Sequence, residues 1–244
     1  MPTVAQLAAA IDHAVLHPAL RRSELIEGCR VAAEHRVAAL CVRSCDVPVA
    51  AQELSGSGVA VCSVIAFPHG AAPSALKLRE TEWALDHGAT EVDVVVNVGS
   101  VLDGDWDSVR GELAALQSRV AERAALLKVI FENVYLGDEH RRRLCQLAAE
   151  LGIAYVKTST GFGTETAEGG LLRTVGARES DVRLMLEAAG PQVKVKASGG
   201  IKTLEQATRF LEMGVARLGT SATVALLAAA GLRPGATAGA AAAR

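Results

Sequence analysis

The chain has 244 residues, of which 50% are hydrophobic but only 3% are aromatic, and it carries a formal net charge of −2. Lys and Arg are scattered rather than gathered on a basic face, so we expect no nucleic-acid partner. No run of about 18 apolar residues predicts a membrane span, and Asp12 and two histidines interrupt the N-terminus where a secretory signal needs an apolar segment, so we expect a soluble cytoplasmic protein.

Short apolar runs rich in β-branched residues alternate along the chain with longer amphipathic segments, which predicts strands and helices in turn. The eight predicted strands are, in chain order, 11–16, 37–42, 59–67, 91–98, 126–132, 154–160, 193–199 and 215–221. Helices are predicted between them over 23–36, 72–87, 106–123, 139–151, 180–189 and 204–213. Gly88, Gly152 and Gly214 each follow a predicted helix at the point where the chain turns into the next strand.

Eight strand–helix units in a chain of 244 residues fit an α/β protein with a single (β/α)₈ TIM barrel. No proline-rich or glycine-rich linker divides the chain, so we place one barrel domain over residues 1–231. Residues 232–244 are rich in alanine and glycine, and we expect them to form a disordered tail of low complexity.

The cysteines and histidines show no pattern that predicts a disulfide or a metal. The five cysteines form an odd set without a C-x-x-C pair, so we expect neither disulfides nor structural zinc. His13 and His17 have the spacing of a helical metal site, but no glutamate stands in the HExxH position and Pro18 follows directly. We expect no metal and no cofactor.

Charged side chains interrupt four of the apolar strands. Because alternate residues of a strand share a face, the pattern predicts that several charged side chains point into the barrel together, namely Asp93, Lys128, Lys157 and Lys196. A single lysine near a strand end is usually a snorkelling side chain. Burying this many unpaired charges for stability alone would be costly, so we interpret the cluster as functional.

Lys157 and Lys196 lie on neighbouring predicted strands, six and seven. Their mutual repulsion and partial burial predict that at least one has a pKa well below about 10.4. A neutral amine attacks a carbonyl carbon and forms a Schiff base, which withdraws electrons from an adjacent carbon–carbon bond. Asp93 is the candidate for the accompanying proton transfers.

The loops after the last three predicted strands carry hydroxyl groups and glycines. Free backbone N–H groups and helix N-termini bind phosphate, and TIM barrels commonly hold phosphate after strands seven and eight. The sequence therefore predicts a phosphate site formed by Thr160, Gly161, Gly199, Gly200, Gly219 and Ser221.

Six motifs resemble those of the deoxyribose-phosphate aldolases: SVIAFPHG (63–70), EVDVVVNVG (91–99), LKVIFE (127–132), VKTSTGFG (156–163), VKASGGIKT (195–203) and RLGTS (217–221). The resemblance extends over residues 11–221. It implies a (β/α)₈ class I aldolase, a carbon–carbon lyase that reversibly splits 2-deoxy-D-ribose 5-phosphate into acetaldehyde and D-glyceraldehyde 3-phosphate in deoxyribonucleoside catabolism. The implied partners are small phosphosugars and aldehydes, and the implied assembly is a homodimer.

By position, the resemblance implies that Lys157 forms the Schiff base, that Lys196 favours its neutral form and that Asp93 transfers protons. It implies further that Asp12 and Lys128 belong to a polar relay around Lys196 and that Cys41 lines the substrate pocket. The glycine and hydroxyl loops named above match the positions that contact phosphate in that family.

Four positions depart from the residues usual in that family, namely Ala14, Asn133, Lys194 and Ala222. Arg43 and Ser44 also replace the more familiar pair after Cys41-Val42. None of these positions belongs to the lysine–aspartate core. We therefore expect changed affinity or rate rather than lost chemistry.

Two other functions remain open on the sequence alone. One is a barrel enzyme that converts another phosphosugar without a covalent intermediate, which would leave Lys157 unexplained. The other is a non-catalytic sensor of sugar phosphates. A coupled assay for glyceraldehyde 3-phosphate distinguishes the three.

Overall fold

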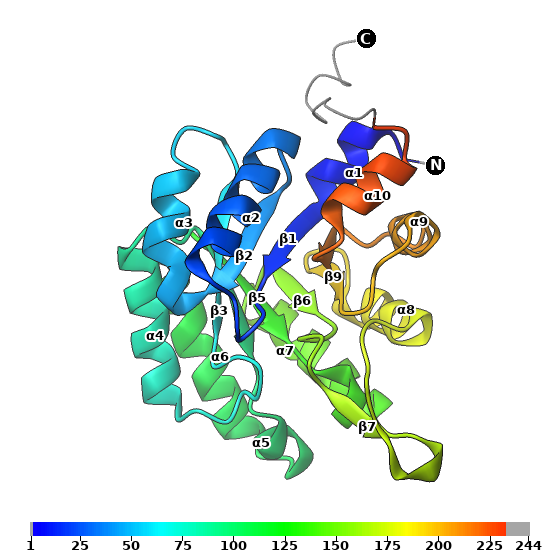
Figure 1. Cartoon of the computed structure of the whole chain (residues 1–244). Coiled ribbons are helices and arrows are strands. Elements are labelled where there is room, and N and C mark those ends of the chain that lie inside the picture. Colours follow the sequence, from blue (N-terminus) through cyan, green and yellow to red (C-terminus); the bar gives the residue numbers. More distant parts are fainter. Residues whose placement is uncertain (1, 233–244) are drawn as a thin grey trace.

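Residues 2–232 are described from a computed structural model of the chain, in which eight parallel strands close into a barrel (Figure 1). Around the barrel the strand order is β1-β10-β9-β6-β5-β4-β3-β2. Their bounds are β1 (Ile11–Val15), β2 (Ala39–Arg43), β3 (Ala60–Ile65), β4 (Glu91–Val95), β5 (Leu126–Ile130), β6 (Tyr155–Lys157), β9 (Lys194–Ser198) and β10 (Arg217–Thr220). The predicted TIM barrel and its eight strands are confirmed, and the predicted tail falls, except for Leu232, outside the described residues.

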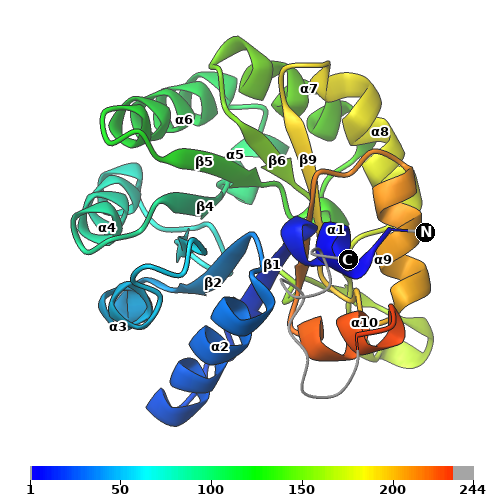
Figure 2. The same ribbon diagram turned by 90° about the horizontal axis from the view of Figure 1, so that it is seen from above.

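Helices surround the barrel and follow the strands in sequence (Figure 2). Those predicted from the sequence are α2 (Arg22–His35), α4 (Ser74–Asp86), α6 (Trp106–Ala121), α7 (Asp138–Glu150), α8 (Glu179–Ala189) and α9 (Leu204–Glu212). The structure adds the shorter helices α1 (Val4–Ala10), α3 (Val47–Glu53), α5 (Val98–Leu102) and α10 (Thr223–Ala229). The predicted strand over 91–98 was too long, because α5 already begins at its last residue.

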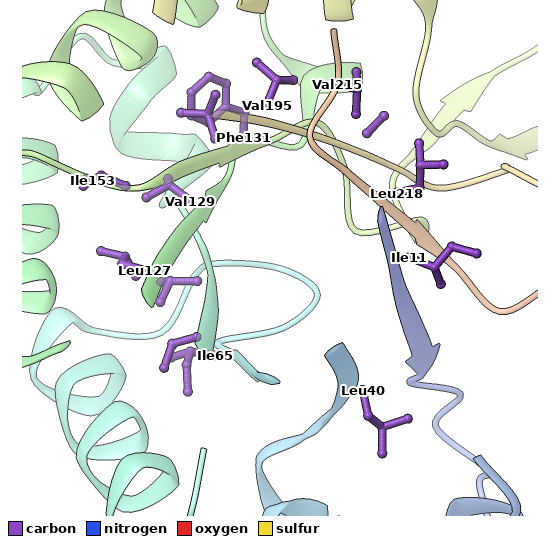
Figure 3. Packing of buried hydrophobic residues seen from close by; sticks show 14 of the residues in the cluster. Ile11, Leu40, Ile65, Leu127, Val129, Phe131, Ile153, Val195, Val215 and Leu218 are labelled. Atoms are coloured by element: carbon purple, nitrogen blue, oxygen red, sulfur yellow. The ribbon is translucent and has the colours of Figure 1, made fainter. Parts of the chain in front are cut away.

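Both faces of the parallel sheet are covered, which explains the near-continuous apolar strands. Outward-facing side chains such as Leu127, Val129 and Val195 are buried in the layer between the barrel and the helices (Figure 3). These residues flank Lys128 and Lys196 in sequence. Since side chains alternate along a strand, the packing that buries the apolar neighbours directs both lysines into the barrel.

The two ends of the barrel differ in what covers them. Helix α1 lies at the end where the strands begin, near the barrel axis in Figure 2. At the opposite end an antiparallel hairpin, β7 (Thr164–Thr166) and β8 (Leu172–Thr174), projects between β6 and α8 (Figure 1). None of the helices within residues 2–232 combines the length and apolar composition that crossing a membrane requires.

Candidate active site

Four strands direct charged side chains to one point inside the barrel. Asp93 of β4 accepts hydrogen bonds from the Nζ atoms of Lys128 at 2.7 Å, Lys157 at 2.8 Å and Lys196 at 2.8 Å. None of these side chains is more than 3% exposed. The strand register accounts for the convergence, because Asp93 is paired with Lys128 and Lys157 with Lys196 on neighbouring strands.

A second set of ion pairs surrounds this group. Asp12 of β1 pairs with Lys196 and, at 2.6 Å, with Arg217 of β10. Glu91, two residues before Asp93 on β4, lies 2.6 Å from Lys128 and 3.3 Å from Arg217. Neither Arg217 nor Glu91 was predicted as part of the site. Glu91 shares a strand face with Asp93, so the alternation could have identified it.

The buried groups do not balance in charge when all are ionised. Three carboxylates, Asp12, Glu91 and Asp93, face four cations, which leaves one excess positive charge. Within residues 2–232, three of the cations form ion pairs with at least two carboxylates each, whereas Lys157 forms an ion pair with Asp93 alone.

Burial opposes ionisation in this cluster, but the ion pairs outweigh it. Despite burial, Lys128, Lys157 and Lys196 hold the pKa of Asp93 well below its usual range. Burial likewise opposes the charged form of Lys196, yet the carboxylates of Asp12 and Asp93 raise its pKa above the usual value. The repulsion between lysines that the sequence predicts therefore does not neutralise Lys196, because Asp12 pairs with it directly.

Two thiols also lie beside Asp93. Cys62 of β3 donates a hydrogen bond from Sγ to Asp93 Oδ1 at 3.0 Å, and its register partner Cys41 of β2 lies beside it. Cys41, Cys62 and Asp93 place potential ligand atoms within 4.8 Å of one another. The ammonium groups of Lys128 and Lys196, which lie 2.7 Å and 2.8 Å from Asp93, would repel a metal cation, so we assign no metal to this triad.

A cavity of about 560 Å³ opens beside Lys157 at the carboxyl ends of the strands. Its wall includes Lys196, Asp12 and Cys41, while Asp93 and Lys128 lie behind it. All six residues of the predicted phosphate site also line it, namely Thr160, Gly161, Gly199, Gly200, Gly219 and Ser221. The structure thus brings the predicted amine and the predicted phosphate loops to one cavity.

The glycine loops of this cavity lie in contact with each other. Gly161 and Gly199 have φ angles of 87° and 88°, which few other residues adopt. A Cβ atom on Gly199 would lie 3.2 Å from the Cα atom of Gly161. Within residues 2–232, the backbone N–H groups of Gly161, Gly199 and Gly200 donate to no protein acceptor. They are available to an anion.

A second, larger cavity of about 740 Å³ adjoins the first over the ends of β2 to β5. The rings of Phe67 and Phe162 pack edge to face with centroids 5.4 Å apart, and Phe162 lines both cavities. The Phe67 ring centroid lies 5.9 Å from Lys157 Nζ. Both rings thus lie near Lys157, at the place where the two cavities meet.

The four positions that depart from the family pattern lie outside the lysine–aspartate cluster. Lys194 is exposed and lies over the Tyr155 ring. Asn133 donates to Met185 Sδ at 3.3 Å, and the Ala222 N–H donates to Thr220 Oγ1 at 2.9 Å. Ala14 alone of the four lines the smaller cavity.

We expect acid to destabilise the protein through His13, which lines the smaller cavity. Burial, reinforced by His35, lowers the pKa of His13 from 6.5 to about 4. As the pH falls, His13 is therefore protonated in the unfolded chain before it is protonated in the folded protein. The free energy of unfolding decreases between the unfolded pKa of 6.5 and the folded pKa of about 4. The loss is on the order of 3 kcal/mol, measurable by denaturant titration at pH 7 and pH 4.5.

The comparison is made with His13→Gln, which cannot titrate, and with His17→Gln, in which an exposed histidine is replaced. His13→Gln should lose less stability than the parent protein between the two pH values, and His17→Gln should lose as much. The raised pKa of Glu132 has the opposite effect on acid stability but is common to all three proteins. Equal losses in all three would contradict the prediction.

The chain is similar in sequence to known aldolases. Residues 6–233 match the family described as DeoC/LacD family aldolase. The chain is 43% identical over 226 residues to the deoxyribose-phosphate aldolase of Rhodospirillum rubrum, covering 93% of this chain and 90% of that protein. It is 36% identical over 217 residues to the deoxyribose-phosphate aldolase of Treponema denticola, covering 89% of this chain and 96% of that protein.

A solved structure shows the same fold. The tetrameric deoxyribose phosphate aldolase from Aeropyrum pernix superimposes with a TM-score of 0.83 at 29% sequence identity. The match covers 93% of this chain and 92% of that chain.

Proposed function

Because this chain belongs to the DeoC/LacD family of aldolases, we propose that it reversibly cleaves 2-deoxy-D-ribose 5-phosphate into D-glyceraldehyde 3-phosphate and acetaldehyde. It does so as a class I aldolase, through a Schiff base. The observation that supports this most is the position of Lys157, whose amine lines a cavity together with glycine loops suited to phosphate. Its role in the cell is the breakdown of deoxyribonucleosides.

The reaction begins with Lys157 as a neutral amine. Its Nζ attacks C1 of the open-chain sugar, and the resulting carbinolamine loses its hydroxyl group as water to give an iminium ion. The C3 hydroxyl then gives up its proton to a base, the C2–C3 bond breaks, and its electron pair moves into an enamine as glyceraldehyde 3-phosphate leaves. Protonation of the enamine at C2 and hydrolysis release acetaldehyde and restore the amine.

Asp93 and Lys196 serve this amine in different ways. Asp93 accepts a hydrogen bond from Lys157 Nζ at 2.8 Å, so it is within reach of the protons that leave and return during carbinolamine formation and loss of water. Lys196 is a fixed cation that shares the Oδ2 atom of Asp93 with Lys157. Asp12 and Lys128 hold these two groups through ion pairs, and Cys41 borders the cavity.

The phosphate group is bound at the other side of the cavity by the loops that follow β6, β9 and β10. The free N–H groups of Gly161, Gly199 and Gly200 are the principal donors, with Gly219 and Ser221 completing the wall. Binding the phosphate there fixes C1 beside Lys157, and such orientation can account for a large part of a rate enhancement.

A coupled assay tests the proposed reaction. Incubation with 2-deoxy-D-ribose 5-phosphate should release glyceraldehyde 3-phosphate and acetaldehyde in equal amounts. Each product is measured with its own coupled dehydrogenase. Conversion of a phosphosugar without acetaldehyde would favour an enzyme that forms no covalent intermediate. An increase in melting temperature with the sugar but no product would favour a sensor.

The remaining partners follow from the same proposal. Small phosphosugars and aldehydes are the molecules the enzyme binds. We propose a homodimer, noting that the relative from Aeropyrum pernix is tetrameric. We propose a cytoplasmic location, which the five free cysteines among the described residues favour because thiols remain reduced there.

A further inference from the structure

Glu132 follows β5 as a buried carboxyl group that the cluster around Asp93 does not include. Glu132 is 2% exposed. Within residues 2–232 it forms no ion pair, because the nearby Lys157 pairs with Asp93 instead. Burial raises the pKa of Glu132, although the hydrogen bonds from Thr160 and the charge of Lys157 act against this. Burying a carboxyl group without a counter-ion costs free energy unless hydrogen bonds compensate for the lost water. The hydrogen bonds of Glu132 therefore indicate what this residue does.

Among the residues that the structure describes, all hydrogen bonds to this carboxyl group come from Thr160. The backbone N–H of Thr160 donates to Oε1 at 3.3 Å and to Oε2 at 3.2 Å, and the Thr160 hydroxyl also donates to Oε2. Gly163 lies against the same group, since a Cβ atom there would come within 2.8 Å of Glu132 Cδ. Glu132 therefore contacts both ends of the loop from Thr160 to Gly163.

Thr160 transmits this restraint to the neighbouring glycine. Its Oγ1 accepts a hydrogen bond from Phe162 N at 2.9 Å, which closes a turn around Gly161. Gly161 in turn packs on Gly199, which has a Cα atom 3.6 Å from the position of a Cβ on Gly161. The carboxyl group of Glu132 thus fixes Thr160, and the turn at Thr160 fixes Gly161 against the second glycine loop.

Glu132 itself does not line the substrate cavity. It lines the larger cavity, whereas Thr160 and Gly161 line the smaller one. Because both hydrogen-bond donors of Thr160 are directed at Glu132, the donor left to bind an anion in this turn is the N–H of Gly161. Donors held in place before binding avoid the cost of ordering the loop around the ligand.

We propose that Glu132 is a positioning residue that holds the Thr160–Gly161 turn in the form that binds phosphate, so that it sets the preference for phosphorylated over unphosphorylated sugars. This inference rests on the proposed aldolase function. It also assigns Thr160 a structural role in the phosphate site, with Gly161 as the residue that contacts the ligand.

Kinetics on two sugars test the inference. Glu132→Ala should raise KM for 2-deoxyribose 5-phosphate about tenfold or more, the ratio that one hydrogen bond to a charged group produces, with kcat changed less than about twofold. With unphosphorylated 2-deoxyribose, kcat/KM should stay within about twofold of the parent value, because this sugar does not use the phosphate loops. Glu132→Gln keeps one oxygen acceptor and should restore part of the KM.

The matched control is Glu80→Gln. Glu80 lines the same larger cavity and accepts a hydrogen bond from the backbone N–H of Ala66 at 2.9 Å, but it does not contact Thr160. Its replacement should leave the KM values of both sugars unchanged. A loss of kcat/KM in Glu132→Ala that is equal for the two sugars, or no loss for either, overturns the inference.

Binding of inorganic phosphate gives a reading that does not depend on turnover. Phosphate should raise the melting temperature of the parent protein, and Glu132→Ala should lose most of that rise. Parent protein that cleaves neither sugar contradicts the proposed function, whereas an unchanged phosphate effect in Glu132→Ala contradicts the inference about Glu132. If Glu132→Ala does not fold, Thr160→Val removes the hydroxyl link while leaving Glu132 in place, and the same readings apply.

Discussion

Borohydride added together with 2-deoxy-D-ribose 5-phosphate should leave a stable adduct on Lys157, and Lys157→Leu should lose both the adduct and turnover. The reason is that only a neutral amine with access to the cavity can form the iminium that borohydride reduces, and Lys157 is the lysine of the cluster with a single carboxylate partner. We expect kcat to fall by about 10⁴-fold or more, as for the loss of other covalent nucleophiles. Peptide mapping by mass spectrometry locates the adduct, and the coupled assay measures kcat.

Lys77→Met is the matched control for this experiment. Lys77 is fully buried and pairs with Glu112 at 2.7 Å, but it lies on α4 outside the barrel interior. Its loss should lower the melting temperature while leaving the adduct on Lys157 and most of the activity. An adduct on Lys196 in the parent protein would show that the roles of the two lysines are exchanged.

The long elements and the faces of the strands could be predicted from the sequence because they depend on local periodicity. Alternation along β4, β5, β6 and β9 is enough to direct Asp93, Lys128, Lys157 and Lys196 inward once a barrel is assumed. Helices such as α1 and α5 were missed because seven and five residues contain too few turns to show a helical period.

The partners of the charged residues could not be predicted from strand periodicity, because they depend on the register between strands that are distant in sequence. Asp12 meets Lys196, and Arg217 meets Glu91, only after β1 and β10 close the barrel. For the same reason the strand pattern predicted the repulsion between the two lysines, whereas Asp12, the carboxylate that keeps Lys196 charged, was placed near Lys196 only by the family resemblance. The link between Glu132 and Thr160 likewise requires the left-handed backbone at Glu132, with φ of 56°, which no local pattern indicated.

Asp93→Asn should remove both activity and a large part of the stability, since Asp93 is the one carboxylate that contacts all three lysines. Replacing it leaves the ammonium groups of the barrel interior with Asp12 and Glu91 alone, and breaking a buried ion pair in this way costs roughly 3–5 kcal/mol. Loss of the group that transfers protons should lower kcat by about 10²-fold to 10⁴-fold. Turnover by the coupled assay and denaturant titration measure the two effects.

The pH dependence of stability distinguishes the effect of the Asp93 charge from the effect of its side-chain packing. Its lowered pKa means that its stabilising effect is complete above the unfolded value of 3.8 and is lost as the pH falls below it, so Asp93→Asn should lose less stability than the parent protein below about pH 4. Asp181→Asn is the control, because Asp181 is a buried carboxylate paired with Arg141 at the surface of the barrel. It should be destabilised but keep kcat within about twofold. Parent-like turnover by folded Asp93→Asn would remove Asp93 from the mechanism and leave water or another group to carry the proton to and from Lys157.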